Sequence, residues 1–301
     1  MDAMQKVQFQ SGGEPLVGDL YAPEGSGLSP AVAIIGPMTY QKEQAPTEYA
    51  RRLAAFGYVA LAYDSRYRGE SGGTPRCWEN PAHKLEDMKS ALAYLASRDD
   101  VDPDKLFILG ICQGSSVAFR AAAEAPGVRA LATIAGQYRD HEGDIAWLTE
   151  QGFAARMEKG RAAKAKFLAS GEVDYVAGVD QHDLDVGMPG EFVWVWYQPW
   201  ADRGIWENRY AVMSDADLLE YESISAARDL KTPWLMVHGD NCFLPEAARR
   251  HMAAVPPSTP TRTIWDDTPH LSYYDQPEVI DRAVGAVSNH FREYGEIARR
   301  T

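Results

Sequence analysis

Short apolar stretches recur along the chain, and their spacing divides it into a regular part and an irregular part. Near the N-terminus, two β-rich segments are separated by a turn, and strands and amphipathic helices then alternate. The strands are expected at residues 6–10, 16–21, 31–35, 58–63, 105–111 and 129–135, and the helices at 47–56, 81–97 and 115–125. This alternation predicts a mostly parallel, doubly wound sheet with helices on both faces.

The alternation stops after about residue 138 and resumes after residue 225. Strands are expected again at 232–237 and 261–265, followed by a closing helix at 277–293. We therefore expect an α/β core built from residues 1–138 and 226–301. Residues 139–225 are expected to form an inserted cap, helical in its first half and rich in aromatic residues in its second.

The most informative motif lies at the end of the strand 105–111, where the chain reads Gly110-Ile-Cys112-Gln-Gly114. A sharp turn from strand to helix holds its central residue in a strained conformation, and glycines on either side avoid clashes. The helix N-terminus favours the thiolate form of a cysteine placed there. Cys112 is therefore the expected nucleophile, and a buried cysteine at a packed corner is the alternative.

A nucleophile on such a turn needs partners, which follow in the order acid and then histidine in enzymes of this arrangement. His270 lies in a polar loop, residues 266–275, between the strand 261–265 and the closing helix. A histidine in that loop can reach Cys112, so His270 is the expected general base.

The acid is less clearly marked. In enzymes with this order of nucleophile, acid and histidine, the corresponding loop usually has an aspartate at the position of Cys242. The carboxylate nearest to that position in this chain is Asp240. A carboxylate that accepts the imidazole N–H fixes the tautomer, so Asp240 is the expected third member. Asp140 and Glu246 remain alternatives.

Two backbone N–H groups should hold the oxyanion of a tetrahedral intermediate. The first belongs to Gln113, directly after the nucleophile. The second lies in the loop after the strand 31–35, where Pro37 has no N–H, and Met38 is expected ahead of Thr39.

The second half of the cap is expected to line a substrate pocket above Cys112. A small cap core or a homodimer surface would use the same side chains, because aromatic residues serve all three roles. The expected substrate-binding residues are Trp194, Trp196, Tyr197, Trp200 and Trp206.

The chain resembles the cysteine-bearing branch of the α/β-hydrolase superfamily, close to dienelactone hydrolases and fungal polyketide transferases. The residues that carry the resemblance are Lys42-Glu43, the segment 54–64, Arg68-Gly-Glu-Ser-Gly-Gly73, Glu86-Asp87, the Cys112 motif, Gly136-Gln-Tyr138 and Pro269-His270. The resemblance implies a Cys-His-Asp triad, without metal or cofactor, that acts on an ester, lactone or thioester of a small, polyketide-like substrate.

The expected chemistry runs through an acyl-cysteine, and the group that resolves it decides the function. Water would make the protein a hydrolase, whereas an alcohol or amine acceptor would make it an acyltransferase or cyclase. A non-hydrolytic lyase or cyclase, or a catalytically silent binding protein, stays open.

The composition of the chain restricts the classes of molecule that the protein is expected to bind. The 301 residues carry a formal net charge of −13, which disfavours nucleic acid and anionic membranes, so a small-molecule acyl substrate is expected. No apolar run approaches a membrane helix and no signal region is seen. Three cysteines suit a reducing compartment, and cytoplasmic residence is therefore expected.

Overall fold

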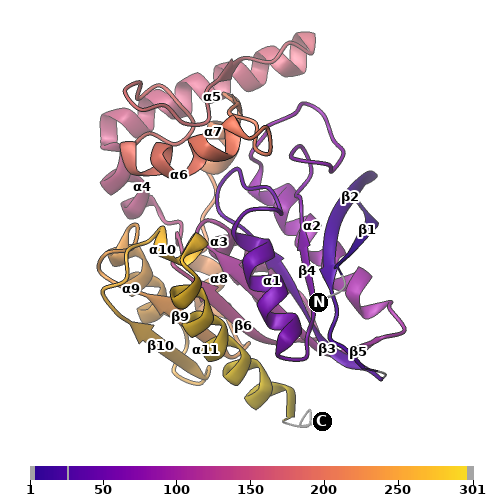
Figure 1. Cartoon of the computed structure of the whole chain (residues 1–301). Helices are drawn as coiled ribbons and strands as arrows, with labels where there is room; N and C mark the ends of the chain where they lie inside the picture. The colour runs from indigo at the N-terminus through magenta and orange to yellow at the C-terminus, as the bar shows by residue number, and fades with distance from the viewer. Residues whose placement is uncertain (1–3, 26, 297–301) are drawn as a thin grey trace.

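The strands predicted from the sequence assemble into one twisted sheet. They are β1 (Met4–Ser11), β2 (Glu14–Tyr21), β3 (Ser29–Ile35), β4 (Val59–Tyr63), β5 (Val101–Ile111), β6 (Val128–Ile134), β9 (Trp234–His238) and β10 (Thr261–Trp265). In the computed structural model, which describes residues 4–25 and 27–296, their order is β1-β2-β4-β3-β5-β6-β9-β10 (Figure 1). The pairs β1–β2 and β2–β4 are antiparallel and the rest are parallel, which confirms the predicted fold class.

Successive residues of a strand point to opposite faces, and the central strands are apolar on both. Phe107 and Leu109 of β5 belong to one core cluster, and Leu106 and Ile108 belong to the other. The first cluster includes residues of α1 (Ala45–Ala55) and α11 (Pro277–Glu296). The second is covered by α2 (Pro81–Ala96), α3 (Gly114–Glu124), α8 (Ile224–Asp229) and α9 (Pro245–Ala254).

Between β6 and α8 the chain leaves the sheet and builds the segment expected to be a cap. Its elements are α4 (His141–Leu148), α5 (Glu150–Ser170), β7 (Tyr175–Val176), α6 (Glu191–Asp202), β8 (Tyr210–Ala211) and α7 (Ser214–Leu218). Figure 1 shows its helices grouped above one end of the sheet. The long helix α5 packs closely on α7, since a Cβ on Gly160 would come within 2.7 Å of the Ala216 nitrogen.

The loop between β10 and α11 contains one further short helix, α10 (Ser272–Asp275), directly after His270. It contacts both α1 and α11 and so lies beside the core. Within the two described ranges, no helix has the length and apolar character needed to cross a membrane.

Candidate functional site

Cys112 occupies a strained turn between β5 and α3. Its φ of 51° lies in the left-handed region, which non-glycine residues rarely adopt. The Cys112 N–H donates to the Ile134 carbonyl at 3.1 Å, and its own carbonyl accepts from the Gln137 N–H at 2.9 Å. Backbone hydrogen bonds to β6 and the turn after it therefore hold the cysteine in this conformation.

The glycines on either side allow the close contact that the turn requires. A Cβ on Gly114 would lie 2.5 Å from the Gly36 carbonyl oxygen, and one on Gly110 would lie 2.7 Å from the Ser115 Cα. The start of α3 is thus pressed against the end of β3, as the motif predicted.

Cys112 opens onto a small cavity of about 40 Å³. Its walls are mostly apolar, and they come from the elbow, the loop after β3, the cap and the two loops after β9 and β10. The lining residues are Met38, Cys112, Gln137, Trp147, Met188, Pro189, Phe192, Val193, Tyr197, Phe243, His270, Leu271 and Tyr274.

The cysteine itself is only 8% exposed, and its surroundings act on the thiol in opposite directions. Burial raises the pKa of the Cys112 thiol above its ordinary value. Hydrogen bonding from the Tyr274 hydroxyl and from the Gln113 and Met38 N–H groups lowers that pKa, as does the charge of Lys84. Burial has the larger effect here, so the resting group is a thiol and not the thiolate that the helix N-terminus alone would favour.

Met38, one of the two expected oxyanion donors, is held in place from the cap. The Tyr197 hydroxyl donates to the Met38 carbonyl at 2.7 Å, and the Trp206 indole N–H donates to the Thr39 carbonyl at 2.7 Å. Thr39 has a φ of 60°, which turns the loop sharply at this point.

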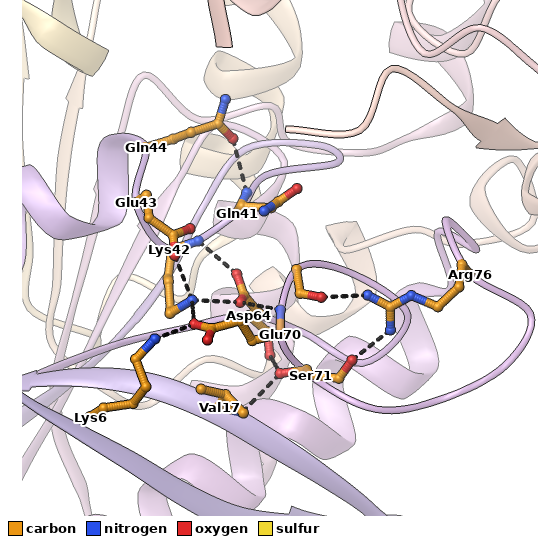
Figure 2. Close-up of polar contacts among 11 residues, drawn as sticks. Lys6, Val17, Gln41, Lys42, Glu43, Gln44, Asp64, Glu70, Ser71 and Arg76 are labelled. Carbon is orange, nitrogen blue, oxygen red and sulfur yellow. Dashed lines mark hydrogen bonds and ion pairs between the residues drawn. The ribbon is translucent and has the colours of Figure 1, made fainter. Parts of the chain in front are cut away.

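The same loop is held from the core by Lys42 (Figure 2). The buried ammonium group of Lys42 lies 2.6 Å from Glu43, 2.9 Å from Asp64 and 2.6 Å from Glu70. The backbone N–H of Lys42 also donates to Asp64, at 2.8 Å. Oxygen atoms of these three carboxylates lie within 4.8 Å of one another, as in a metal site. The Lys42 ammonium already bonds all three, so the cluster is an ion-pair network that fixes the loop.

The imidazole ring of His270 has two hydrogen-bond partners among the described residues, and neither is a carboxylate. The Phe243 backbone N–H donates to Nδ1 at 3.1 Å, and Nε2 lies 2.9 Å from the Tyr274 hydroxyl oxygen. Burial, with a further contribution from His238, lowers the pKa of His270 to about 3. The ring is therefore neutral at ordinary pH.

The expected acid, Asp240, does not fit the role assigned to it. Its side chain is 59% exposed and pairs with Arg249, which also binds Glu246 at 2.6 Å. Asp140 caps α4 through the Gly143 N–H at 2.7 Å and binds Arg250. In the described part of the chain, all three candidate carboxylates are thus paired with arginines, and none of them hydrogen-bonds to His270.

Cys242, at the usual aspartate position, is buried, with its sulfur 3.9 Å from the Thr268 carbonyl oxygen. Burial raises the pKa of this thiol to about 12. A thiol that stays protonated supplies no negative charge to His270. Cys242 therefore does not replace the carboxylate that usually occupies this position.

The aromatic residues of the cap divide into two groups. Tyr197 lines the cavity, whereas the four tryptophans expected beside it lie outside its walls. The Trp196 indole N–H donates to Asp275 at 2.9 Å, the Trp200 ring stacks against Arg203, and Trp194 packs on the core while partly buried. The Trp206 indole N–H donates to the Thr39 carbonyl, and a buried indole N–H needs such an acceptor, so hydrogen bonding fixes Trp196 and Trp206 outside the cavity walls.

Sequence reasoning missed the aromatic walls that the cavity does have. They are Trp147 of α4, Phe192 of α6 and Phe243 of the loop after β9. It also missed Tyr274, although the spacing of four residues from His270 places two side chains about one helical turn apart.

Gln137 is the remaining polar residue of the cavity. It is 3% exposed, and its amide nitrogen is buried with no hydrogen-bond partner in the described part of the chain. Buried polar groups are ordinarily paired, so this amide is an exception that needs an explanation.

The order of strands, the elbow after β5 and the histidine after the last strand together define the α/β-hydrolase fold, which the sequence predicted. The crystal structure of protein PA2218 from Pseudomonas aeruginosa superposes with a TM-score of 0.82 at 22% identity, over 97% of this chain and 94% of the other. The family model described as serine aminopeptidase, S33, matches residues 43–185, which contain the elbow.

Curated relatives are similar over less than half of their length. Protein PA2218 of Pseudomonas aeruginosa is 36% identical over 132 residues, which cover 43% of this chain and 36% of that protein. Polyketide transferase claH of Penicillium crustosum is 36% identical over 126 residues, 41% of each chain. Thiohydrolase apmlB of Arthrinium phaeospermum is 31% identical over 135 residues, 44% of this chain and 43% of its own.

The close contact at Gly114 leads to a prediction about stability. Gly114→Ala should lower the free energy of unfolding by about 1–3 kcal/mol, because the new methyl group overlaps backbone atoms of β3 and Gly36. Gly285→Ala is the control, since it lies in α11 with nothing within 4 Å of the added Cβ. It should raise that free energy by about 0.5–1 kcal/mol. Denaturant unfolding measures both, and equal effects would contradict the contact.

Proposed function

We propose that this protein is a cysteine-dependent acyl-transfer enzyme that hydrolyses an ester, lactone or thioester of a small organic acid. The observation that carries the proposal is the position of Cys112. Its sulfur lies at a strained elbow, in a mostly apolar cavity, and hydrogen bonding from the Gln113 and Met38 N–H groups lowers the pKa of its thiol.

Those two N–H groups suit the charge that develops during acyl transfer. When the Cys112 sulfur bonds to a carbonyl carbon, the oxygen becomes an anion, and preorganised N–H donors stabilise it. Departure of the leaving group then gives an acyl-cysteine, which a second nucleophile resolves. The proposed oxyanion donors are therefore Gln113 and Met38, and Asp240 has no part in the set.

The volume of the cavity and the names of the relatives restrict the class of substrate that we propose. About 40 Å³ is room for roughly three water molecules or one small apolar group beside the sulfur. Relatives named thiohydrolase and polyketide transferase favour a thioester among the three acyl donors.

Acyl transfer to an alcohol or amine is the second candidate. The aromatic walls formed by Trp147, Phe192 and Phe243 offer an organic acceptor more contact area than they offer water. The name of the polyketide transferase relative supports the same alternative. Product analysis with and without added alcohols distinguishes the two candidates.

Cys112→Ala should abolish turnover of acyl thioesters and aryl esters, because Cys112 is the only thiol among the described residues that line the cavity. Cys77→Ala is the matched control, since that buried thiol bonds to Glu207 at 3.1 Å and lies outside the cavity walls. It should keep wild-type kcat/KM. Turnover that persists in Cys112→Ala would instead indicate a lyase or cyclase, and wild-type protein that binds without turnover would indicate a binding protein.

Asp240→Asn should leave kcat within about twofold of wild type, because the exposed carboxylate is paired with Arg249 and not with His270. Steady-state kinetics on the same thioester gives the answer. A fall of two or more orders of magnitude would assign Asp240 to the orientation of His270 after all.

A further inference from the structure

The hydrogen bonds at His270 run in a fixed direction. A backbone N–H can only donate, so the Phe243 N–H at 3.1 Å requires a lone pair on Nδ1. The neutral ring then carries its proton on Nε2. Nε2 lies 2.9 Å from the Tyr274 oxygen and therefore donates to it.

This direction leaves the Tyr274 hydroxyl proton free for another acceptor. Tyr274, His270 and Cys112 line the same cavity, and hydrogen bonding from the Tyr274 hydroxyl lowers the pKa of the Cys112 thiol. The chain of donors thus runs from Phe243 through His270 and Tyr274 to Cys112. In the usual nucleophile–histidine–carboxylate arrangement the direction is the reverse, and the histidine accepts the nucleophile's proton.

We propose that Tyr274 is a catalytic residue whose hydroxyl donates to the Cys112 sulfur, and that His270 is a positioning residue that holds this hydroxyl as a donor. The proposal rests on the acyl-cysteine chemistry proposed above, and it replaces the expected role of His270 as general base.

The step balances without a base in the protein. The Cys112 S–H bond breaks and its proton leaves to water, while Tyr274 and His270 keep theirs. The thiolate then bonds to the carbonyl carbon, the C=O pair moves to oxygen, and the leaving group departs with its bonding pair. When water resolves the acyl-cysteine, the C–S pair returns to sulfur, where the Tyr274 hydroxyl again stabilises it, and the water proton goes to solvent.

The electrostatic setting of the sulfur agrees with this role. Burial, and after it the negative charge of the Cys112 thiolate once that forms, holds the pKa of Tyr274 well above its usual range, so the hydroxyl remains a donor. The titratable and charged groups that face Cys112 are Tyr274 of α10, Tyr197 of α6, Lys84 of α2, and His270 and Cys242 of the loops.

The test is the pH dependence of Cys112 alkylation by iodoacetamide, followed by site-resolved mass spectrometry. Wild type should show one inflection, above the range of an ordinary thiol. Tyr274→Phe should move it upward by about one to two pH units and lower kcat/KM for a thioester about tenfold to a hundredfold, because a hydrogen bond to an anion is lost. Tyr273→Phe is the control, since that hydroxyl donates to Asp266 at 2.9 Å, and it should leave the inflection in place.

A measurement on the unmodified protein covers the case in which Tyr274→Phe fails to fold. The ¹⁵N chemical shifts of His270 should show a proton on Nε2 and none on Nδ1 from pH 5 to pH 9. A protonated Nδ1, or a wild-type inflection near pH 5 that indicates a thiolate–imidazolium pair, would overturn the proposal. Neither result would affect the requirement for Cys112, which the Cys112→Ala variant tests separately.

A second inference comes from the unpaired amide of Gln137. Its backbone is fixed beside the nucleophile, because its N–H donates to the Cys112 carbonyl at 2.9 Å and its carbonyl accepts from Ser116 at 2.7 Å. The amide nitrogen is buried with no partner among the described residues, and Gln137 lines the cavity. A site that presents a buried donor favours ligands that pair with it and rejects analogues that do not.

We infer that the acyl group of the substrate carries an oxygen acceptor, as a hydroxyl or keto group, which receives a hydrogen bond from Gln137. The inference deepens the proposed function by naming the class of acyl group: short, mostly apolar and oxygenated near the scissile carbonyl. A plain hydrocarbon chain would leave the amide unpaired.

The probes are N-acetylcysteamine thioesters of butanoate, 2-hydroxybutanoate and 3-hydroxybutanoate. Wild type should prefer one hydroxylated probe, and Gln137→Met should reduce that preference about three- to tenfold without lowering the melting temperature. Gln198→Met on α6 is the control, because that amide bonds to Asp202 away from the cavity, and it should keep the wild-type ratio. A ratio unchanged in Gln137→Met would overturn the inference, whereas turnover independent of Cys112 would overturn the proposed function instead.

Discussion

The left-handed turn at Cys112 is the constraint on which the site depends. A non-glycine residue keeps a φ of 51° only where its surroundings hold it there, and here backbone hydrogen bonds to Ile134 and Gln137 do so. The contact between Gly114 and the end of β3 completes the turn. This turn places Cys112 at the wall of the cavity.

The second side of the site is the loop after β3, and it is fixed from two directions. On one side, Lys42 of the loop pairs with the buried Asp64 and with the exposed Glu70. From the cap, Tyr197 and Trp206 donate to consecutive carbonyls of the same loop. These contacts together position the Met38 N–H. Aromatic residues of the cap therefore contribute to the proposed chemistry in two ways, because they hold this loop in place and also line the cavity.

The sequence was sufficient for features that depend on local spacing. The glycines around Cys112 predicted the elbow, and alternating apolar segments predicted the parallel core, because both patterns restrict the backbone directly. The direction of a side chain was harder to predict. Asp240 lies in the expected loop, but Arg249, nine residues later, turns it outward. Trp196 and Trp206 lie in the expected segment, but their indole N–H groups donate to Asp275 and to the Thr39 carbonyl, which lie outside the cavity walls. The role of Tyr274 could not be predicted from the sequence, because it depends on the loop conformation that places this side chain beside His270.

The central claim is that turnover passes through an acyl group on Cys112. Rapid-quench peptide mapping during turnover of a short-chain acyl thioester tests it most directly. The account predicts an acyl mass on the peptide that contains Cys112, formed in the first turnover at the same rate as the release of the thiol product. Full thiol release with no acyl group on that peptide at any time, or an acyl group on a different residue, would contradict it.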